Sequence, residues 1–328
     1  MMDPASLYDA CQVSLVRCLY TVAEHCPHLP ANTPPLHRLR NLAQVLLATT
    51  PTQAPPAVPE LTLADALTLL STSRELLATL GWAGAGGQVG EELRQALSET
   101  TAALMAQVGT VLRWEQAHRV RGLYVIIDPQ VTNGRDPLEI ATAAIRGGAK
   151  MLQLRDKLRD KGDTLHLATQ LQQLCRAHDV DLIINDHVDL AALVGCAGVH
   201  VGQTDLPVGQ ARRVLSPGQV VGRSNHEMEE LTQSQEMGAD HVAFGAIYTT
   251  GTKGVGRPPQ GVDRLRRAKE ATQVPLVAIG GINAGNVAPV VEAGADAICV
   301  TAAVGLAPEP EAAAAQLVEA IREAGGRG

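Results

Sequence analysis

The stretch of sequence that decides the fold runs GAKMLQLRDK from Gly148 to Lys157. Its middle is short and apolar, as in a buried strand, and its end is charged. In an extended chain Gln153, Arg155 and Lys157 alternate, so their side chains leave the same side. A glutamine and two cations at a strand end suit an anion such as a phosphate or diphosphate. The alternative is an edge strand that runs into a solvated turn.

A Gly-Ala pair like the one before this strand recurs twice, each time between a predicted helix and a predicted strand, at Gly238-Ala239 and Gly294-Ala295. Glycine fits the left-handed position that ends a helix. Short apolar runs in this part of the chain predict eight strands: Leu123–Ile127, Lys150–Leu154, Asp181–Ile184, Gly198–Val201, Val220–Gly222, His241–Phe244, Leu276–Ile279 and Ala297–Val300. Amphipathic stretches between them predict helices, for instance Leu138–Arg146, Thr164–Ala177, Glu227–Met237, Gly285–Glu292 and Glu311–Glu323.

Eight strands that alternate with helices in about 210 residues predict a (β/α)₈ (TIM) barrel, an α/β fold, over residues 119–328. A doubly wound open sheet is the alternative, but no G-x-G-x-x-G motif follows the first strand, where Asp128-Pro129-Gln130 stands instead. In a barrel, functional residues lie at the C-terminal ends of the strands. Candidate site residues must therefore follow the predicted strands.

Residues 1–118 have a different pattern and predict an all-α N-terminal domain. Apolar residues recur at helical spacing over 6–25, 36–47, 63–80 and 91–117, with Thr62 placed to cap the third helix. The proline-rich segment 49–59 predicts an exposed loop. The glycine-rich segment 81–90 follows a helix and lacks a closing Lys-Ser/Thr pair, so it predicts a connector rather than a phosphate-binding loop.

The composition limits the classes of function. Hydrophobic residues make up 45% of the chain and charged residues 19%, which describes a soluble protein with a large core. Seven aromatic residues and a net charge of −7 argue against a nucleic-acid partner. Six cysteines without metal-type spacing, no signal-peptide pattern and no membrane-spanning apolar run predict a cytoplasmic protein.

Two aspartates follow adjacent predicted strands. Asp186 and Asp205 could share one hard divalent ion, since Mg²⁺ binds through one or two carboxylates plus water and substrate phosphate oxygens. The alternative is that each aspartate caps the helix after its strand.

A second anion site is predicted after strand 6, where Thr250, Gly251, Thr252 and Lys253 form a compact donor group suited to a monophosphate. The alternative is a polar surface loop. Gly281, Thr301 and Ala302 match the phosphate site commonly built after strands 7 and 8 of such barrels. His200, inside a strand, is predicted to line the barrel, His226 to begin a helix, and His187 to lie at the rim.

Six of these motifs, in order and in register over about residues 120–325, resemble the thiamine-phosphate synthase family: Gln153–Lys157, Asn185-Asp186, Gly198–Asp205, Ser224–His226, Thr250–Lys253 and Gly280–Ile282. The resemblance implies a transferase that joins 4-amino-2-methyl-5-hydroxymethylpyrimidine diphosphate to thiazole phosphate, giving thiamine phosphate and diphosphate. This sequence departs from the family pattern at two places. It has Gly245-Ala246 where members often have Gly-Pro, and His187 where Arg or Asp is common.

By the same resemblance each motif has a role. Gln153, Leu154, Arg155, Asp156, Lys157 and Asn185 would hold the pyrimidine diphosphate, and Asp186 and Asp205 would bind Mg²⁺. The thiazole phosphate would be held by Thr250, Gly251, Thr252, Gly281, Thr301 and Ala302. Ser224 would contact substrate, and Lys253 would lie between the two phosphates. Arg155, Lys157, Ser224 and Lys253 are thus the expected catalytic residues.

Three alternatives stay open. One is a thiazole tautomerase of the related regulator-like family, in which His226 would act as acid and base. Another is a ligand-sensing barrel. The helical domain also faintly resembles one fused to some synthases and associated with phosphorylating the pyrimidine monophosphate. Its helix starts largely lack the expected Arg and Asp residues, so a degenerate, structural or homo-oligomer-forming role is preferred.

Overall fold

The computed structural model describes residues 4–26, 29, 33–50, 52–55, 61–82, 90–251 and 258–327. The chain divides into two compact units, Met1–Leu112 and Arg113–Gly328. Part of the predicted proline-rich loop (51 and 56–59) and most of the predicted glycine-rich connector (83–89) lie outside the described residues.

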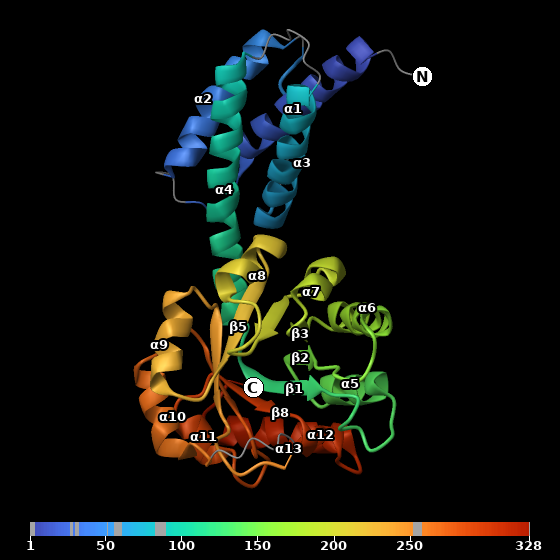
Figure 1. The fold of residues 1–328 in the computed structure, drawn as a ribbon, viewed down its shortest axis with the longest axis vertical. Helices are drawn as coiled ribbons and strands as arrows, with labels where there is room; N and C mark the ends of the chain where they lie inside the picture. The colour runs from blue at the N-terminus through green and yellow to red at the C-terminus, as the bar shows by residue number, and fades with distance from the viewer. Residues whose placement is uncertain are drawn as a thin grey trace. The chain divides into compact units, whose positions relative to one another are not determined.

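The first unit is all-helical, as the sequence predicts. It contains α1 (Pro4–His25), α2 (Pro34–Thr49), α3 (Leu63–Trp82) and most of α4 (Glu91–His118), labelled in Figure 1. The predicted cap of α3 is confirmed, because the Thr62 hydroxyl accepts a hydrogen bond from the Asp65 amide at 3.1 Å and the Asp65 carboxylate accepts one from the Thr62 amide at 3.0 Å.

The helical unit has an aliphatic core of its own, with Leu15, Leu39, Leu70 and Leu104 fully buried.

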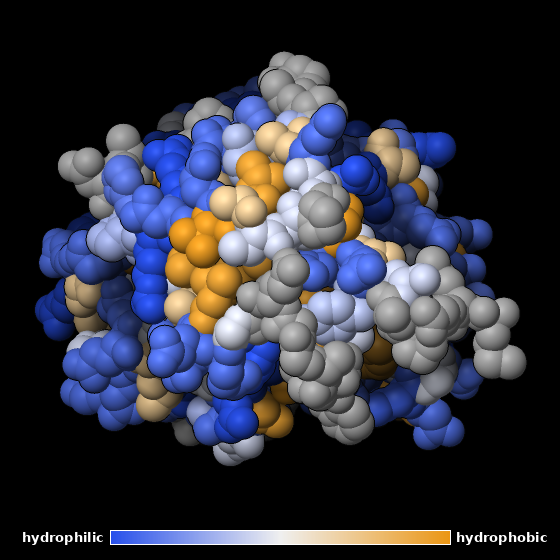
Figure 2. Space-filling model, turned by 90° about the horizontal axis from the view of Figure 1, so that it is seen from above, coloured by the Kyte–Doolittle hydropathy of each residue, from blue (hydrophilic) through white to orange (hydrophobic). Residues whose placement is uncertain are grey.

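Most of the surface visible in Figure 2 is hydrophilic, with a limited hydrophobic area near its centre. Among the described residues, no helix is both long enough and apolar enough to cross a membrane.

The second unit is a closed barrel of eight parallel strands in sequential order, each paired with the next and β1 with β8. The strands are β1 (Gly122–Ile127), β2 (Met151–Leu154), β3 (Asp181–Asn185), β4 (Gly198–Val201), β5 (Val220–Asn225), β6 (His241–Gly245), β7 (Leu276–Ile279) and β8 (Ala297–Val300). The helices are α5 (Pro137–Arg146), α6 (Lys161–Ala177), α7 (Val188–Val194), α8 (Val208–Val214), α9 (Met228–Glu236), α10 (Gly261–Glu270), α11 (Ala288–Glu292), α12 (Ala302–Gly305) and α13 (Pro310–Glu323). The predicted barrel is therefore confirmed (Figure 1).

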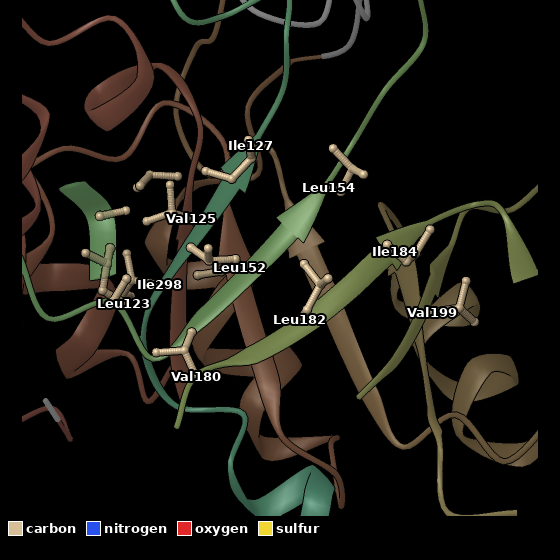
Figure 3. Close-up of a cluster of buried hydrophobic side chains, with 14 of the residues drawn as sticks. Leu123, Val125, Ile127, Leu152, Leu154, Val180, Leu182, Ile184, Val199 and Ile298 are labelled. Atoms are coloured by element: carbon tan, nitrogen blue, oxygen red, sulfur yellow. The ribbon is translucent and has the colours of Figure 1, made fainter. Parts of the chain in front are cut away.

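The strands are largely buried on both faces, which explains why most of their residues are apolar. β5 is longer than the predicted Val220–Gly222, because it continues through the polar residues Arg223, Ser224 and Asn225. One set of alternate residues packs between the strands and the helices, as Figure 3 shows for Leu123, Leu152 and Leu182. The other set, which includes Tyr124, Met151 and Ile183, fills the barrel interior.

The helix-to-strand turns follow the Gly-Ala pattern of the sequence. Gly148, Gly238 and Gly294 have φ values of +97°, +81° and +95°, a region that favours glycine, so their predicted role as helix terminators is confirmed. One helix is shorter than predicted. Residues before Ala288 instead form a turn in which the Asn286 carboxamide accepts from the Asn283 amide at 2.8 Å, and α11 begins only after it.

Candidate active site

Polar side chains gather at the C-terminal ends of β1 to β5. We call this group the strand-end cluster and define it by its members: Asp128, Gln153, Arg155, Lys157, Asn185, Asp186, Asp205 and Ser224. All but Asp128 are site residues expected from the sequence. Because the strands are parallel and adjacent, their C-terminal ends form one rim of the barrel.

Gln153 occupies the interior face of β2. Its side chain is buried, and its Nε2 donates to the Tyr124 hydroxyl of β1 at 2.7 Å. Burial raises the pKa of Tyr124 well above its usual value, so the phenol stays neutral. The Gln153 amide is therefore held in one place by Tyr124, a residue that the sequence motifs do not include.

Arg155 follows β2 and turns toward β1. Its guanidinium donates to the carboxylate of Asp128, which is almost fully buried and lies directly after β1. The Asp128 carboxylate also accepts from the Gln130 amide at 2.9 Å, so the ion pair is fixed at its acidic end. The sequence signal for Asp128 was its position at a strand end, the same signal that selected Asp186.

Lys157 and Asp186 form a hydrogen-bonded ion pair between the loop after β2 and the end of β3. Burial acts to raise the pKa of the Asp186 carboxyl, but hydrogen bonds with Lys157 and Asp205 outweigh it and hold that pKa below its usual value. Asp186 has φ +61°, in the left-handed region that Asp and Asn tolerate better than most residues.

Asp205 lies beside Asp186, close enough for the two carboxyl groups to share a hydrogen bond. Burial, followed by the neighbouring Asp186, raises the pKa of Asp205. The Asp205 carboxylate accepts from the Gly202 amide at 2.7 Å. Neither aspartate is the N-cap of the next helix, since His187 precedes α7 and Pro207 precedes α8, so the capping alternative is wrong.

The predicted set does not all face one space. Leu154 packs outward in the layer between strands and helices, and Asp156 uses its buried carboxylate to accept from the amides of Leu158 and Arg159. These two side chains are therefore engaged in the fold. Asn185 ends β3, half-buried and in register with His200 of β4.

The predicted second phosphate group is described only in part. Thr250 and Gly251 end the described segment after β6, while Thr252 and Lys253 lie outside the described residues. Gly281, after β7, has φ +69°, and a Cβ there would lie 2.6 Å from the Thr249 carbonyl oxygen, so only glycine fits. Thr301 and Ala302 lie where β8 leads into α12.

The predicted places of two histidines are confirmed. His200 lines the barrel interior, with Nε2 2.9 Å from the Ser224 hydroxyl and Nδ1 3.4 Å from Nε2 of His241 on β6. His187 lies at the rim, as the N-cap of α7. His226 follows β5, and its Nδ1 lies 2.7 Å from the Gly245 carbonyl oxygen.

The burial of His241 predicts that the barrel loses unfolding free energy as the pH falls. Its ring is fully buried, and burial lowers its pKa from 6.5 to about 3. Below pH 6.5 the unfolded chain binds a proton that the folded barrel does not, so stability falls as the pH falls. From pH 7 to pH 5 this single site should cost about 2 kcal/mol of unfolding free energy.

Urea unfolding at the two pH values checks this expectation. The His241→Gln variant should lose about 2 kcal/mol less than the unchanged protein between pH 7 and pH 5. An equal loss in both proteins would show that His241 is not the group responsible.

The barrel and its strand-end cluster place the chain in the class of (β/α)₈-barrel enzymes. A family model described as "Thiamine monophosphate synthase" matches residues 123–304. The chain belongs to this family of transferases.

Curated relatives agree. A "Thiamine-phosphate synthase" from Shouchella clausii (strain KSM-K16) is 40% identical over 202 residues, which cover 62% of this chain and 97% of the relative. One from Synechococcus sp. (strain WH7803) is 38% identical over 230 residues, covering 70% of this chain and 65% of the relative.

A solved structure is also similar. The thiamine phosphate pyrophosphorylase from Pyrococcus furiosus has a TM-score of 0.58 and 30% sequence identity, covering 63% of this chain and 98% of that one. The family resemblance expected from the sequence is thus confirmed. The family model starts at residue 123 and so leaves the helical unit unmatched.

Proposed function

We propose that the barrel condenses 4-amino-2-methyl-5-hydroxymethylpyrimidine diphosphate with thiazole phosphate to give thiamine phosphate and diphosphate. Beyond family membership, the observation that carries this proposal is the meeting of Lys157, Asp186 and Asp205 at one rim, beside Arg155. Two cations and two carboxylates together suit an anionic leaving group and a divalent ion.

Two carboxylates in contact fit a magnesium ion. Burial, followed by the neighbouring Asp186, raises the pKa of Asp205, and a dication between the two groups would favour the charged form of both. Carboxylate oxygens are also the ligands that Mg²⁺ prefers. We therefore assign Asp186 and Asp205 as its protein ligands. When bound, the ion would neutralise charge that develops on the departing diphosphate.

Arg155 and Lys157 would bind the diphosphate from the two sides of β2. Asp128 holds the Arg155 guanidinium in place, so little side-chain entropy is lost when a phosphate binds. Lys157 has a half-exposed side chain. Its ammonium group could therefore give up its hydrogen bond to Asp186 and donate to a phosphate oxygen instead. Gln153, Asn185 and Ser224 line the interior below and would orient the pyrimidine.

The reaction itself is driven by the electronic structure of the pyrimidine substrate. The electron-rich aminopyrimidine expels diphosphate and leaves a stabilised cation, which the thiazole nitrogen attacks. No covalent enzyme nucleophile is needed. The protein contributes by stabilising the leaving group and by positioning the second substrate through Thr250, Gly251, Thr252, Gly281, Thr301 and Ala302, with Lys253 between the two phosphates.

A direct assay tests the function. Full-length protein with both substrates and Mg²⁺ should release thiamine phosphate and diphosphate in equal amounts, and chelation by EDTA should stop the reaction. Folded protein that yields neither product under these conditions would refute the proposal.

For the helical unit we propose a structural or oligomer-forming role rather than phosphorylation of the pyrimidine monophosphate. Its core is aliphatic, and its helix starts largely lack the Arg and Asp residues expected of the phosphorylating domain. ATP, Mg²⁺ and the pyrimidine monophosphate incubated with the full chain should give no pyrimidine diphosphate. Formation of that product would assign kinase activity to the chain instead.

We place the enzyme in the cytoplasm. None of its six cysteines, all of them in the described part of the chain, forms a disulfide, and Cys175, Cys196 and Cys299 are buried in the barrel, which suits a reducing compartment.

A further inference from the structure

Two imidazole rings lie inside the barrel, one on each of the strands that flank β5. His200, Gly222 and His241 are register partners across β4, β5 and β6, so they form one row of the interior. A Cβ on Gly222 would lie 2.0 Å from His241 Nε2 and 2.5 Å from His200 Nδ1. The absent side chain of Gly222 is therefore the space in which the two rings meet.

The ring of His241 has one nitrogen with a partner and one without. Its Nε2 faces His200 Nδ1 at 3.4 Å, whereas its Nδ1 is buried and has no hydrogen-bond partner among the described residues. The ring is fully buried and neutral, so it carries a single proton. A buried N–H without an acceptor is rarer and costlier than a buried lone pair without a donor. The proton of His241 therefore belongs on Nε2.

This choice sets the direction of the remaining hydrogen bonds. With its proton on Nε2, His241 donates to His200 Nδ1, which must then be the unprotonated nitrogen of a neutral ring. His200 accordingly carries its proton on Nε2 and donates to the Ser224 hydroxyl oxygen, 2.9 Å away. If these hydrogen bonds ran from Ser224 to His200 to His241 instead, His241 would carry its proton on Nδ1, which has no partner among the described residues.

Ser224 is fixed in two further ways. It belongs to β5, which runs on to Asn225, and its backbone carbonyl accepts from Gln203 Nε2 at 2.7 Å. A hydroxyl that already accepts from His200 has its own proton to give, and a hydroxyl that accepts one hydrogen bond donates the next more strongly.

We propose that His241 and His200 are positioning residues that set the direction of the Ser224 hydroxyl, so that Ser224 donates its proton to an acceptor atom of the pyrimidine diphosphate. The last step, from Ser224 to substrate, rests on the proposed function. The hydrogen-bond direction from His241 to Ser224 does not.

Nitrogen NMR tests the direction without any variant. In full-length protein labelled with ¹⁵N-histidine, two-bond ¹⁵N–¹H correlations distinguish the two neutral tautomers of each ring. We expect the Nε2–H tautomer for both rings, assigned by the loss of signals in His241→Gln and His200→Gln. A His200 ring protonated on Nδ1 overturns the proposal, even in a protein that makes thiamine phosphate.

Kinetics test the link to substrate with a matched pair of variants. His241→Gln keeps an N–H donor near the position of Nε2, whereas His241→Phe removes it. The Phe variant should lose about tenfold in kcat/KM for the pyrimidine diphosphate, with the KM for thiazole phosphate unchanged, and the Gln variant should keep most of the activity. Equal losses toward both substrates, or equal losses in both variants, would mean that the ring only fills space.

These outcomes separate the two proposals. If the unchanged protein makes no thiamine phosphate, the proposed function fails while the tautomers can still be read. If it is active but the tautomers or the Phe-to-Gln difference disagree, the positioning role alone fails.

Discussion

Asp186→Asn should lower kcat/KM by about 100- to 1000-fold, because it removes one of the two carboxylates assigned to the metal. Asparagine is the appropriate replacement. It has nearly the same size, and it tolerates the left-handed backbone conformation that residue 186 adopts at φ +61°. Alanine would add backbone strain to the loss of charge. The measurement is the initial rate with both substrates over a range of Mg²⁺ concentrations.

The chain supplies a matched control. Asp189, three residues further on in α7, also pairs with a lysine, Lys161, at 2.7 Å, but both side chains are more than half exposed. Asp189→Asn should change kcat/KM less than twofold, since exposed ion pairs contribute little. A full-size loss in Asp189→Asn, or full activity in Asp186→Asn, would remove Asp186 from the metal site.

Mg²⁺ dependence adds a second readout. With one carboxylate left, Asp205 alone would hold the ion, so the Mg²⁺ concentration for half-maximal rate should rise in Asp186→Asn. High Mg²⁺ should recover part of the rate. A lower rate with unchanged Mg²⁺ dependence would instead indicate that Asp186 acts through Lys157.

The barrel was predictable because its strands carry their signal locally. Most strands are buried on both faces and give a short, mainly apolar run, and each Gly-Ala turn needs a left-handed residue before the next strand. Parallel order follows from the helices between strands. Placing Arg155, Lys157, Asp186 and Asp205 at one rim then required only the fold.

What the sequence could not give was the pairing of side chains across strands. Asp128 meets Arg155 across β1 and β2, and His241 meets His200 across the gap left by Gly222. Such contacts depend on the register between strands, which no single strand encodes. Alternation alone also did not show that the Asp156 carboxylate would fold back onto the turn after β2.

The second large effect is expected at Lys157. Lys157→Met keeps the length of the side chain and removes its charge, so one charge-assisted hydrogen bond to the departing diphosphate is lost. The rate of product formation should fall roughly ten- to hundredfold. Because its side chain is half-exposed, Lys157 adds little to the fold, and the urea midpoint should stay nearly unchanged.

The effect of Lys157 should also depend on Asp186, because the two form an ion pair before substrate binds. Without Lys157, the Asp186 carboxylate loses its donor and the metal site becomes more negative, so Mg²⁺ should bind at least as well as before. The defect should therefore appear in kcat and in the KM for the pyrimidine diphosphate rather than in Mg²⁺ dependence, the opposite of Asp186→Asn. Lys161→Met, which breaks the exposed Lys161–Asp189 pair, is the matched control and should retain full activity. A different result would contradict this role. If Lys157→Met raised the Mg²⁺ concentration for half-maximal rate and left kcat unchanged, Lys157 would serve only to position Asp186, and Arg155 alone would bind the diphosphate.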